Sequence, residues 1–424
     1  MIPIGEGIKF PKMRLAKRRI EVPKLADIQG AVIAELNKLD LPQKIRPGMR
    51  IAVTAGSRGI ANIALILSTV VSELKRVGAQ PFLVPCMGSH GGATAEGQLE
   101  VLHSLGVTEE SVGCPIISQM EVVEISRTQD GIPVYIDKVA AGADGIVVVN
   151  RVKPHTEYKG EIESGLMKMM AIGLGKHKGA FTTHSYALQR SYRIAIPTIA
   201  REILKSAPIL FGLAIVENTY DETAKVVAVE PNLFEETEKE LLKEAKDFLP
   251  RLPFDRLDIL IVDELGKEIS GSGMDTNVIG RVMVFGEPEP ESPRITRIVV
   301  LDLSKATYGS AIGVGLADFT TRRLANKIDY RVTYINCLTA MTPEKARLPM
   351  VGETDKEAIE WAFLTAGVLD PEKARVVRIK NTLHLDEIYI SESLVPELQG
   401  KPGWEIEERE REIKFNAEGK IYID

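Results

Sequence analysis

Cysteine is scarce in this chain of 424 residues, and several patterns typical of metal-binding or membrane proteins are missing. The three cysteines, Cys86, Cys114 and Cys337, are widely spaced, and no two form a Cys-x-x-Cys motif. This argues against a disulfide framework and favours a reducing compartment, the cytoplasm. No run of eighteen apolar residues occurs, and the first residues lack the charged-then-apolar order of a signal peptide. The sequence therefore predicts a soluble cytoplasmic protein without a membrane partner.

An excess of positive charge is also absent. The chain has 53 Lys and Arg residues against 59 Asp and Glu residues, which gives a formal charge of −6. This argues against nucleic acid as a partner, and we interpret the short basic segment 14–19 as a solvated face. With 26% charged and 44% hydrophobic residues, the composition is typical of a globular protein of two or three domains.

Alternating apolar patterns predict an α/β fold. An apolar run at 50–56 is followed by a series with helical spacing from 60 to 74 and by a second apolar run at 80–85. This order is typical of the βαβ unit of a parallel sheet. Ligands of such sheets collect at the carboxyl ends of the strands, where Ser57-Arg58 and His90 would lie.

A turn with two prolines, 250–253, divides the pattern in two, because proline stops the helix expected at 234–249. Strands are expected before this turn at 144–150 and 209–216, and after it at 258–263 and 297–301, with a helix at 355–366 and a hairpin at 413–423. We therefore predict an N-terminal α/β domain, residues 1–252, and a C-terminal α/β domain, residues 253–424.

The histidines differ in their surroundings. His90 stands between glycines just after a predicted strand, and His155 follows the strand at 144–150, so both are candidate reactive groups; the alternative for His90 is a purely structural turn. His103 and His384 fit a helix and a strand and are interpreted as structural. No His-Glu-x-x-His motif and no closely spaced histidine pair predicts a preformed zinc site.

Lys168 stands among Leu and Met residues, where a desolvated amine would become a nucleophile. From the residues alone, the interpretation we favour is a lysine that snorkels from a half-buried helix. The segment 173–176, Gly-Leu-Gly-Lys, lacks the spacing of a phosphate-binding loop. The loop 270–277 is rich in glycine and hydroxyl groups. It is expected either to bind phosphate or sugar-acid hydroxyls or to be a flexible surface turn.

The combination of a glycine-flanked histidine, Pro154-His155, Ser164-Gly165-Leu166-Met167-Lys168 and His184 resembles the nickel-dependent lactate racemase family. The resemblance is clearest over 150–184. It implies two α/β domains with the active site in the interdomain cleft. It also implies a nickel pincer nucleotide, a pyridinium mononucleotide with sulfur donors, made by separate cofactor-biosynthesis enzymes.

Position by position, the resemblance implies that Lys168 tethers the cofactor and His184 binds nickel, with His177 as the competing nickel ligand. It makes His90 and His155 the two acid/base histidines. It further implies cofactor contacts at Ser57, Arg58 and Ser164, and binding of the substrate carboxylate by Arg58 or Lys153. Trp361 lies where the family has a tryptophan near the cofactor, but core packing is the interpretation we favour.

These residues predict a racemase or epimerase that inverts C2 of a 2-hydroxy acid, which could be an aldonic acid, malate-like or lactate-like. Two alternatives remain open. One is a zinc-dependent hydrolase or lyase that uses the same histidines. The other is a non-catalytic protein that binds a nucleotide or the nickel cofactor. The sequence does not predict an oligomeric state.

Overall fold

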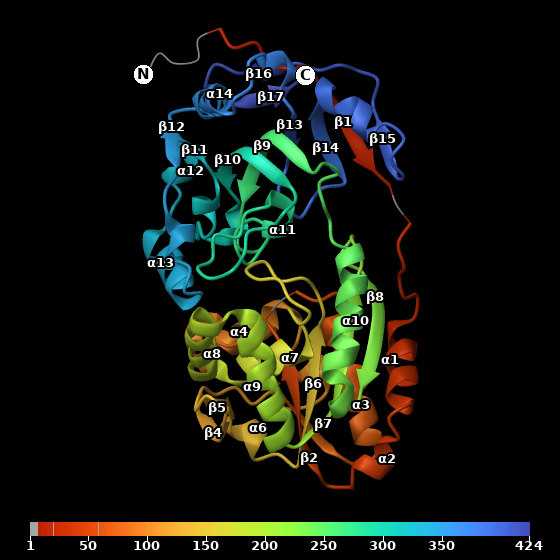
Figure 1. Cartoon of the computed structure of the whole chain (residues 1–424). Coiled ribbons are helices and arrows are strands. Elements are labelled where there is room, and N and C mark those ends of the chain that lie inside the picture. Colours follow the sequence, from red (N-terminus) through yellow and green to blue (C-terminus); the bar gives the residue numbers. More distant parts are fainter. Residues whose placement is uncertain (1–6, 20, 58) are drawn as a thin grey trace. The chain divides into compact units, whose positions relative to one another are not determined.

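The computed structural model describes residues 7–19, 21–57 and 59–424 (Figure 1). The chain forms two compact units, of which one comprises residues 22–249. The other comprises residues 250–424 together with the N-terminal segment up to residue 21. Each unit is built around its own β-sheet, which confirms the predicted α/β class. Whether the units are separate domains, divided after residue 252, stays a prediction.

The sheet of the unit 22–249 has the strand order β3-β2-β6-β7-β8. Strands β3 (Gln80–Pro85), β2 (Arg50–Ala55), β6 (Gly145–Arg151) and β7 (Ile209–Glu217) are parallel neighbours, and β8 (Thr223–Val229) is antiparallel to β7. The central strands are buried on both faces, which explains why they read as continuous apolar runs.

The predicted βαβ unit is confirmed. Helix α3 (Ile63–Arg76) connects β2 to β3, and its buried face includes Ile66, Leu67, Val70 and Leu74. The other helices of this unit, apart from those that follow β6 and enter the site, are α1 (Ile28–Asn37), α2 (Leu41–Lys44), α4 (Ala95–Ser104), α5 (Glu109–Val112), α6 (Lys138–Ala141) and α10 (Phe234–Asp247). A separate hairpin consists of β4 (Val122–Arg127) and β5 (Pro133–Asp137).

The strand order creates a topological switch point between β2 and β6. The chain passes from β2 to β3 on one side, whereas β6 pairs with β2 on the other side. In open parallel sheets, ligands bind outside the carboxyl ends of the strands at such a point. The loops that follow β3, β2 and β6 all begin at this edge.

An irregular helical segment follows the loop after β6. It consists of α7 (Leu166–Lys168), a π-helical stretch at Met169–Leu174 and α8 (Lys176–Arg190), and α9 (Tyr192–Ser206) comes next. π-Helical turns are rare and occur frequently at functional sites. This segment carries Lys168, His177 and His184.

The other unit has an eight-stranded sheet in the order β12-β11-β10-β9-β13-β14-β1-β15. Its first five strands are parallel and its last three are antiparallel to their neighbours. The strands are β12 (Met350–Gly352), β11 (Phe319–Thr321), β10 (Arg294–Leu303), β9 (Arg256–Leu265), β13 (Val376–Ile379), β14 (Glu387–Ser391), β1 (Met13–Arg18) and β15 (Trp404–Ile406). Its helices are α11 (Thr276–Ile279), α12 (Arg322–Ala325), α13 (Tyr330–Thr339), α14 (Asp355–Thr365) and α15 (Val395–Leu398).

The sequence did not indicate strand β1, because its basic residues conceal the alternation of apolar ones. Arg14 pairs with Glu392 at 2.5 Å, and Lys17 lies 3.3 Å from Glu407, so the basic segment is paired with carboxylates. The interpretation of segment 14–19 as a solvated face stays a prediction, because these side chains and their partners are all partly exposed.

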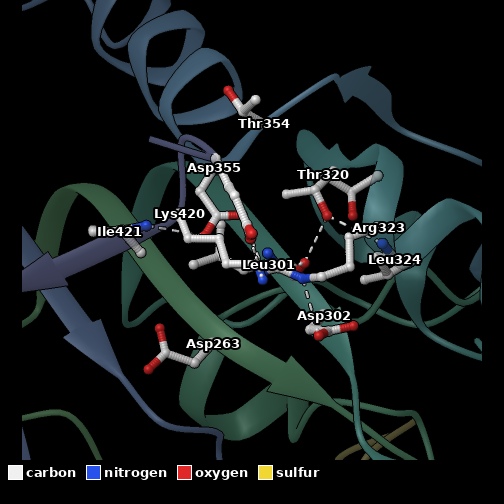
Figure 2. Close-up of polar contacts among 12 residues, drawn as sticks. Asp263, Leu301, Asp302, Thr320, Arg323, Leu324, Thr354, Asp355, Lys420 and Ile421 are labelled. Carbon is white, nitrogen blue, oxygen red and sulfur yellow. Dashed lines mark hydrogen bonds and ion pairs between the residues drawn. The ribbon is translucent and has the colours of Figure 1, made fainter. Parts of the chain in front are cut away.

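The expected C-terminal hairpin is confirmed as β16 (Ile413–Phe415) and β17 (Ile421–Ile423). Figure 2 shows how Asp355, the first residue of α14, connects it to the sheet. The Asp355 carboxylate accepts a hydrogen bond from the Ile421 amide at 3.1 Å and lies 3.0 Å from Arg323, which also binds Asp302 at 3.0 Å. Trp361 packs against this core, as expected.

His384 does not lie in a strand, contrary to the sequence interpretation. It is exposed in the loop after β13, and its amide donates to the Asn381 side chain. The flexible-turn alternative for the loop 270–277 is also wrong, because Ser270, Ser272 and Thr276 are buried. Of the helices in the part of the chain that the structure describes, none is long and apolar enough to span a membrane.

Candidate functional site

His90 lies in the glycine-rich loop after β3. Its Nδ1 is 2.7 Å from the hydroxyl oxygen of Ser57, which follows β2, so two neighbouring strand ends contribute to one contact. Gly91 has φ of +64°, and a Cβ atom there would lie 2.4 Å from the backbone of Gly97. The glycine is therefore required for the loop to pack against α4. Arg58, the next residue after Ser57, lies outside the described residues.

His155 lies in the loop after β6, and both of its ring nitrogens have partners. Nδ1 accepts a hydrogen bond from the Glu157 amide at 3.1 Å, and Nε2 is 2.6 Å from Nζ of Lys168. Because Nδ1 accepts, a neutral His155 carries its proton on Nε2 and donates it to a neutral Lys168 amine. The neutral amine is the nucleophilic form of lysine.

The loop that carries His155 is held by Glu163, whose side chain is fully buried. The Glu163 carboxylate accepts hydrogen bonds from the amides of His155 at 2.6 Å and Gly160 at 3.2 Å. Lys246, on α10, lies 2.8 Å from the same carboxylate and compensates its charge. The position of His155 therefore depends on a charge-assisted network that no local sequence pattern predicts.

A row of rings connects His155 to His184. The His155 ring stacks on Tyr158 with centroids 4.5 Å apart, and Tyr158 stacks on Tyr192 at 4.9 Å. The edge of Tyr192 meets the His184 ring at 5.6 Å. Burial raises the pKa of Tyr158 well above its ordinary value, so this hydroxyl stays protonated and donates to the Glu163 carbonyl at 2.7 Å.

His184 has the properties of a neutral ligand. Its Nδ1 is 2.7 Å from the Tyr192 hydroxyl, and its Nε2 has no hydrogen-bond partner among residues 7–19, 21–57 and 59–424. Burial lowers the pKa of His184 to about 4. The imidazole is therefore unprotonated at neutral pH. By contrast, the side chain of His177 is exposed.

The backbone before Lys168 is fixed by Glu238, which is buried on α10. Its carboxyl group accepts a hydrogen bond from the Met167 amide at 2.9 Å. A Cβ atom at Gly165 would lie 2.3 Å from Cδ of Glu238, so the glycine of the Ser-Gly-x-x-Lys motif is required by this close approach. Burial raises the pKa of Glu238 to about 8.

Lys153 and Ser164 form a backbone bridge across the base of the His155 loop. The Lys153 amide donates to the Ser164 carbonyl at 3.0 Å, and the Ser164 amide donates back at 3.2 Å. Both side chains are half-buried. The structure thus brings together Ser57 with His90 and His155 with Lys168, whereas the roles predicted for Lys153 and Ser164 stay predictions.

The residues that sequence reasoning missed contact the predicted site residues or fix the backbone that carries them. They are Glu157, Tyr158, Glu163, Tyr192 and Glu238. Only Gly165 offered a sequence signal, since glycine before a short helix indicates a close approach. Among the described residues, no group of three or more His, Cys, Asp or Glu side chains is arranged to hold a metal ion.

The chain is thus an α/β protein in which two histidine-containing contacts follow strand ends near the switch point, the place where open parallel sheets bind ligands. Residues 14–194, somewhat less than half of the chain, match the family model described as the lactate racemase N-terminal domain. This segment is therefore similar to the N-terminal domain of lactate racemases, as the resemblance indicated.

Two solved structures are similar in fold. The lactate racemase apoprotein from Thermoanaerobacterium thermosaccharolyticum has a TM-score of 0.52 at 12% identity, over 88% of this chain and 98% of that chain. A Thermotoga maritima protein solved by a structural genomics consortium has a TM-score of 0.51 at 14% identity, over 80% of this chain and 86% of that chain. Comparison with curated protein sequences gives no match.

Proposed function

We propose that this protein is a racemase or epimerase that inverts C2 of a 2-hydroxy acid with the help of a nickel pincer nucleotide. The observation that supports this most directly is the 2.6 Å contact between the Lys168 amine and His155, within the segment that matches the lactate racemase N-terminal domain. A tether lysine and an acid/base histidine are thus adjacent in one unit.

The side chains fit the chemistry of such a cofactor. Lys168 would hold it covalently through its amine. His184 would supply a neutral imidazole to nickel through Nε2, while Nδ1 is oriented by Tyr192. The bound cofactor would accept a hydride from C2 and return it. A single protein ligand suffices here, because the remaining nickel donors belong to the cofactor.

The protein's own residues move the proton of the substrate hydroxyl. One imidazole accepts this proton as C2 loses hydride and the 2-oxo acid forms, and the other donates a proton when hydride returns to the opposite face. His90 and His155 would each serve one enantiomer. Ser57 holds the His90 ring, and the Glu163 network holds the His155 backbone.

The substrate carboxylate requires a cation. Lys153 and Arg58 are the candidates, with the guanidinium preferred for its planar pair of donors. The substrate itself is an aldonic acid, a malate-like acid or a lactate-like acid. The cytoplasm, where the cofactor-biosynthesis enzymes would load the protein, is the proposed location.

Intact-mass analysis tests the tether. The protein is produced with and without the cofactor-making enzymes and then digested to locate any adduct. The expected result is an adduct on the peptide containing Lys168, with bound nickel, and its loss in Lys168→Met. A matched control is Lys205→Met, at an exposed position on α9. Stereoisomer interconversion by a loaded protein whose Lys168 peptide is unmodified would contradict the proposal.

Chiral chromatography of a panel of 2-hydroxy acids tests the reaction. With the loaded protein, His90→Ala and His155→Ala should each lower the rate by about 10²–10⁴-fold while keeping the adduct. An adduct without conversion of any acid would favour the non-catalytic alternative. Zinc bound without an adduct would favour the hydrolase or lyase alternative.

A further inference from the structure

A fully buried lysine contacts the end of strand β3, just before the loop that carries His90. Lys176 is 0% exposed, and its ammonium group meets three acceptors. They are the Pro85 carbonyl at 2.5 Å, Oε1 of Gln98 at 3.2 Å and a carboxylate oxygen of Asp137 at 3.3 Å. An ammonium group has three protons, so each of them is used. Lys176 is therefore not the phosphate-binding lysine that the segment 173–176 superficially suggests.

Gln98 extends this network to the catalytic loop. It is 0% exposed, and because its Oε1 faces the ammonium group of Lys176, the orientation of the amide is fixed. The Nε2 group then donates to the carbonyl of Gly88 at 2.9 Å and to that of His90 at 3.3 Å. Both amide protons thus bind the loop that carries the His90 imidazole.

The place of Lys176 in the sequence connects this loop to the cofactor residues. Lys176 stands eight residues after Lys168 and eight before His184, where the π-helical stretch meets α8. Its φ is +54°, a conformation that costs a non-glycine residue about 1 kcal/mol or more. Glycine would avoid this cost, so the side chain itself explains why lysine fits here.

We propose that Lys176 and Gln98 are positioning residues that fix the His90 loop relative to the helical segment bearing Lys168 and His184. This inference rests on the proposed function, since it assigns His90 an acid/base role. Stability alone does not account for the pair, because burying an ammonium group is costly and an apolar pair of similar volume is often as stable. The network orients the His90 backbone, while Ser57 orients its ring.

The sharpest test is Gln98→Glu, which keeps the shape of the side chain. A carboxylate still accepts the hydrogen bond from Lys176 but places oxygen instead of N–H groups against the two loop carbonyls. We expect kcat to fall about 10–100-fold with KM changed less than about twofold, because misplacing a catalytic group by about 1 Å can cost that much. Gln189→Glu, the same change at an exposed position of α8, should leave kcat unchanged.

A second measurement does not depend on racemase activity. In protein with ¹³C-labelled histidine, the imidazole signal of His90, assigned from its absence in His90→Ala, should shift in Gln98→Glu and in Lys176→Met. The signal of His384, which is exposed and distant in sequence, should not shift. If the protein racemises no acid, this measurement still tests the positioning role.

Two further variants keep the test valid if Lys176→Met folds poorly. Lys176→Gly removes the ammonium group while relieving the positive φ, and it should shift the His90 signal without a loss of the native circular dichroism spectrum. In loaded enzyme, Lys176→Gly combined with Gln98→Glu should lower kcat no more than the worse single variant, because both break one network. The proposal would be overturned if folded Gln98→Glu kept both the His90 signal and kcat unchanged. It would also be overturned if the losses of kcat in the two single variants added fully in the double variant.

Discussion

The hydroxyl group of Tyr192 provides the most direct test of how the protein holds nickel. It is 2.7 Å from Nδ1 of His184, and its ring stacks on Tyr158. Tyr192→Phe removes this hydrogen bond and leaves the stacked ring in place. If Nε2 of His184 binds nickel, the hydroxyl fixes the tautomer and the orientation of the ligand from the opposite nitrogen.

The expected magnitude follows from the geometry. A hydrogen bond of this length contributes about 0.5–1.5 kcal/mol, and the Nδ1 group left without a partner in a buried site adds to the loss. Removing such an outer partner typically weakens metal binding about 10–100-fold. We therefore expect Tyr192→Phe to weaken nickel retention within this range, whereas the folded structure loses little stability.

The assay is competition for nickel between the cofactor-loaded protein and a chelator, followed by measurement of the metal that remains. The matched control is Tyr186→Phe, on the same helix as His184, α8. It removes a 2.5 Å hydrogen bond from the Tyr186 hydroxyl to Asp130. His184→Ala sets the value for complete loss of the ligand. Retention by Tyr192→Phe equal to that of the control, with clear loss in His184→Ala, would refute the role of Tyr192.

Three further predictions concern the fold. Burial raises the pKa of Glu238 to about 8, so between pH 4.5 and 8 this carboxyl group ionises in the unfolded chain but not in the folded one. As the pH rises through this range, the free energy of unfolding of the wild type should therefore fall relative to that of Glu238→Gln, by at most about 5 kcal/mol. Denaturant unfolding of both proteins at pH 5 and pH 8 measures this difference, and parallel pH profiles would contradict it. Asp355→Ala should speed hydrogen exchange of the Ile421 amide and lower the free energy of unfolding by about 1–3 kcal/mol. Undiminished protection of this amide would refute the role of Asp355 in holding the C-terminal hairpin. Gly173→Ala places a Cβ atom 2.6 Å from a carbonyl oxygen and a methionine sulfur and should lower the melting temperature, whereas Gly59→Ala, which meets nothing within 4 Å, should not.

The parts of the fold that the sequence predicted are those in which one physical signal dominates. Strands buried on both faces appear as unbroken apolar runs, so β2, β6 and β9 were evident. Helix α10 was evident because it has an apolar stripe and stops before Pro250. Strand β1 was not evident, because the strands with which it pairs, β14 and β15, lie almost four hundred residues away.

The same distinction applies to the candidate site. His90 and His155 follow buried strands, so their loops could be placed at the sheet edge from local patterns alone. The groups that orient the histidines come from elsewhere in the chain, because Glu163 is paired with Lys246 and the His184 ring is held by Tyr192. Such pairings require the folded chain and have no local signature.

The contacts of Lys168 bear on two interpretations that the sequence left open. A snorkelling lysine extends its ammonium group to water, where it stays charged. Here the amine instead lies against Nε2 of His155, whose other nitrogen accepts an amide proton, so the neutral form of the amine is the one that completes the hydrogen bonding. The nucleophile interpretation stays a prediction, which the orientation of an imidazole thirteen residues earlier in the chain supports together with the apolar neighbours of Lys168.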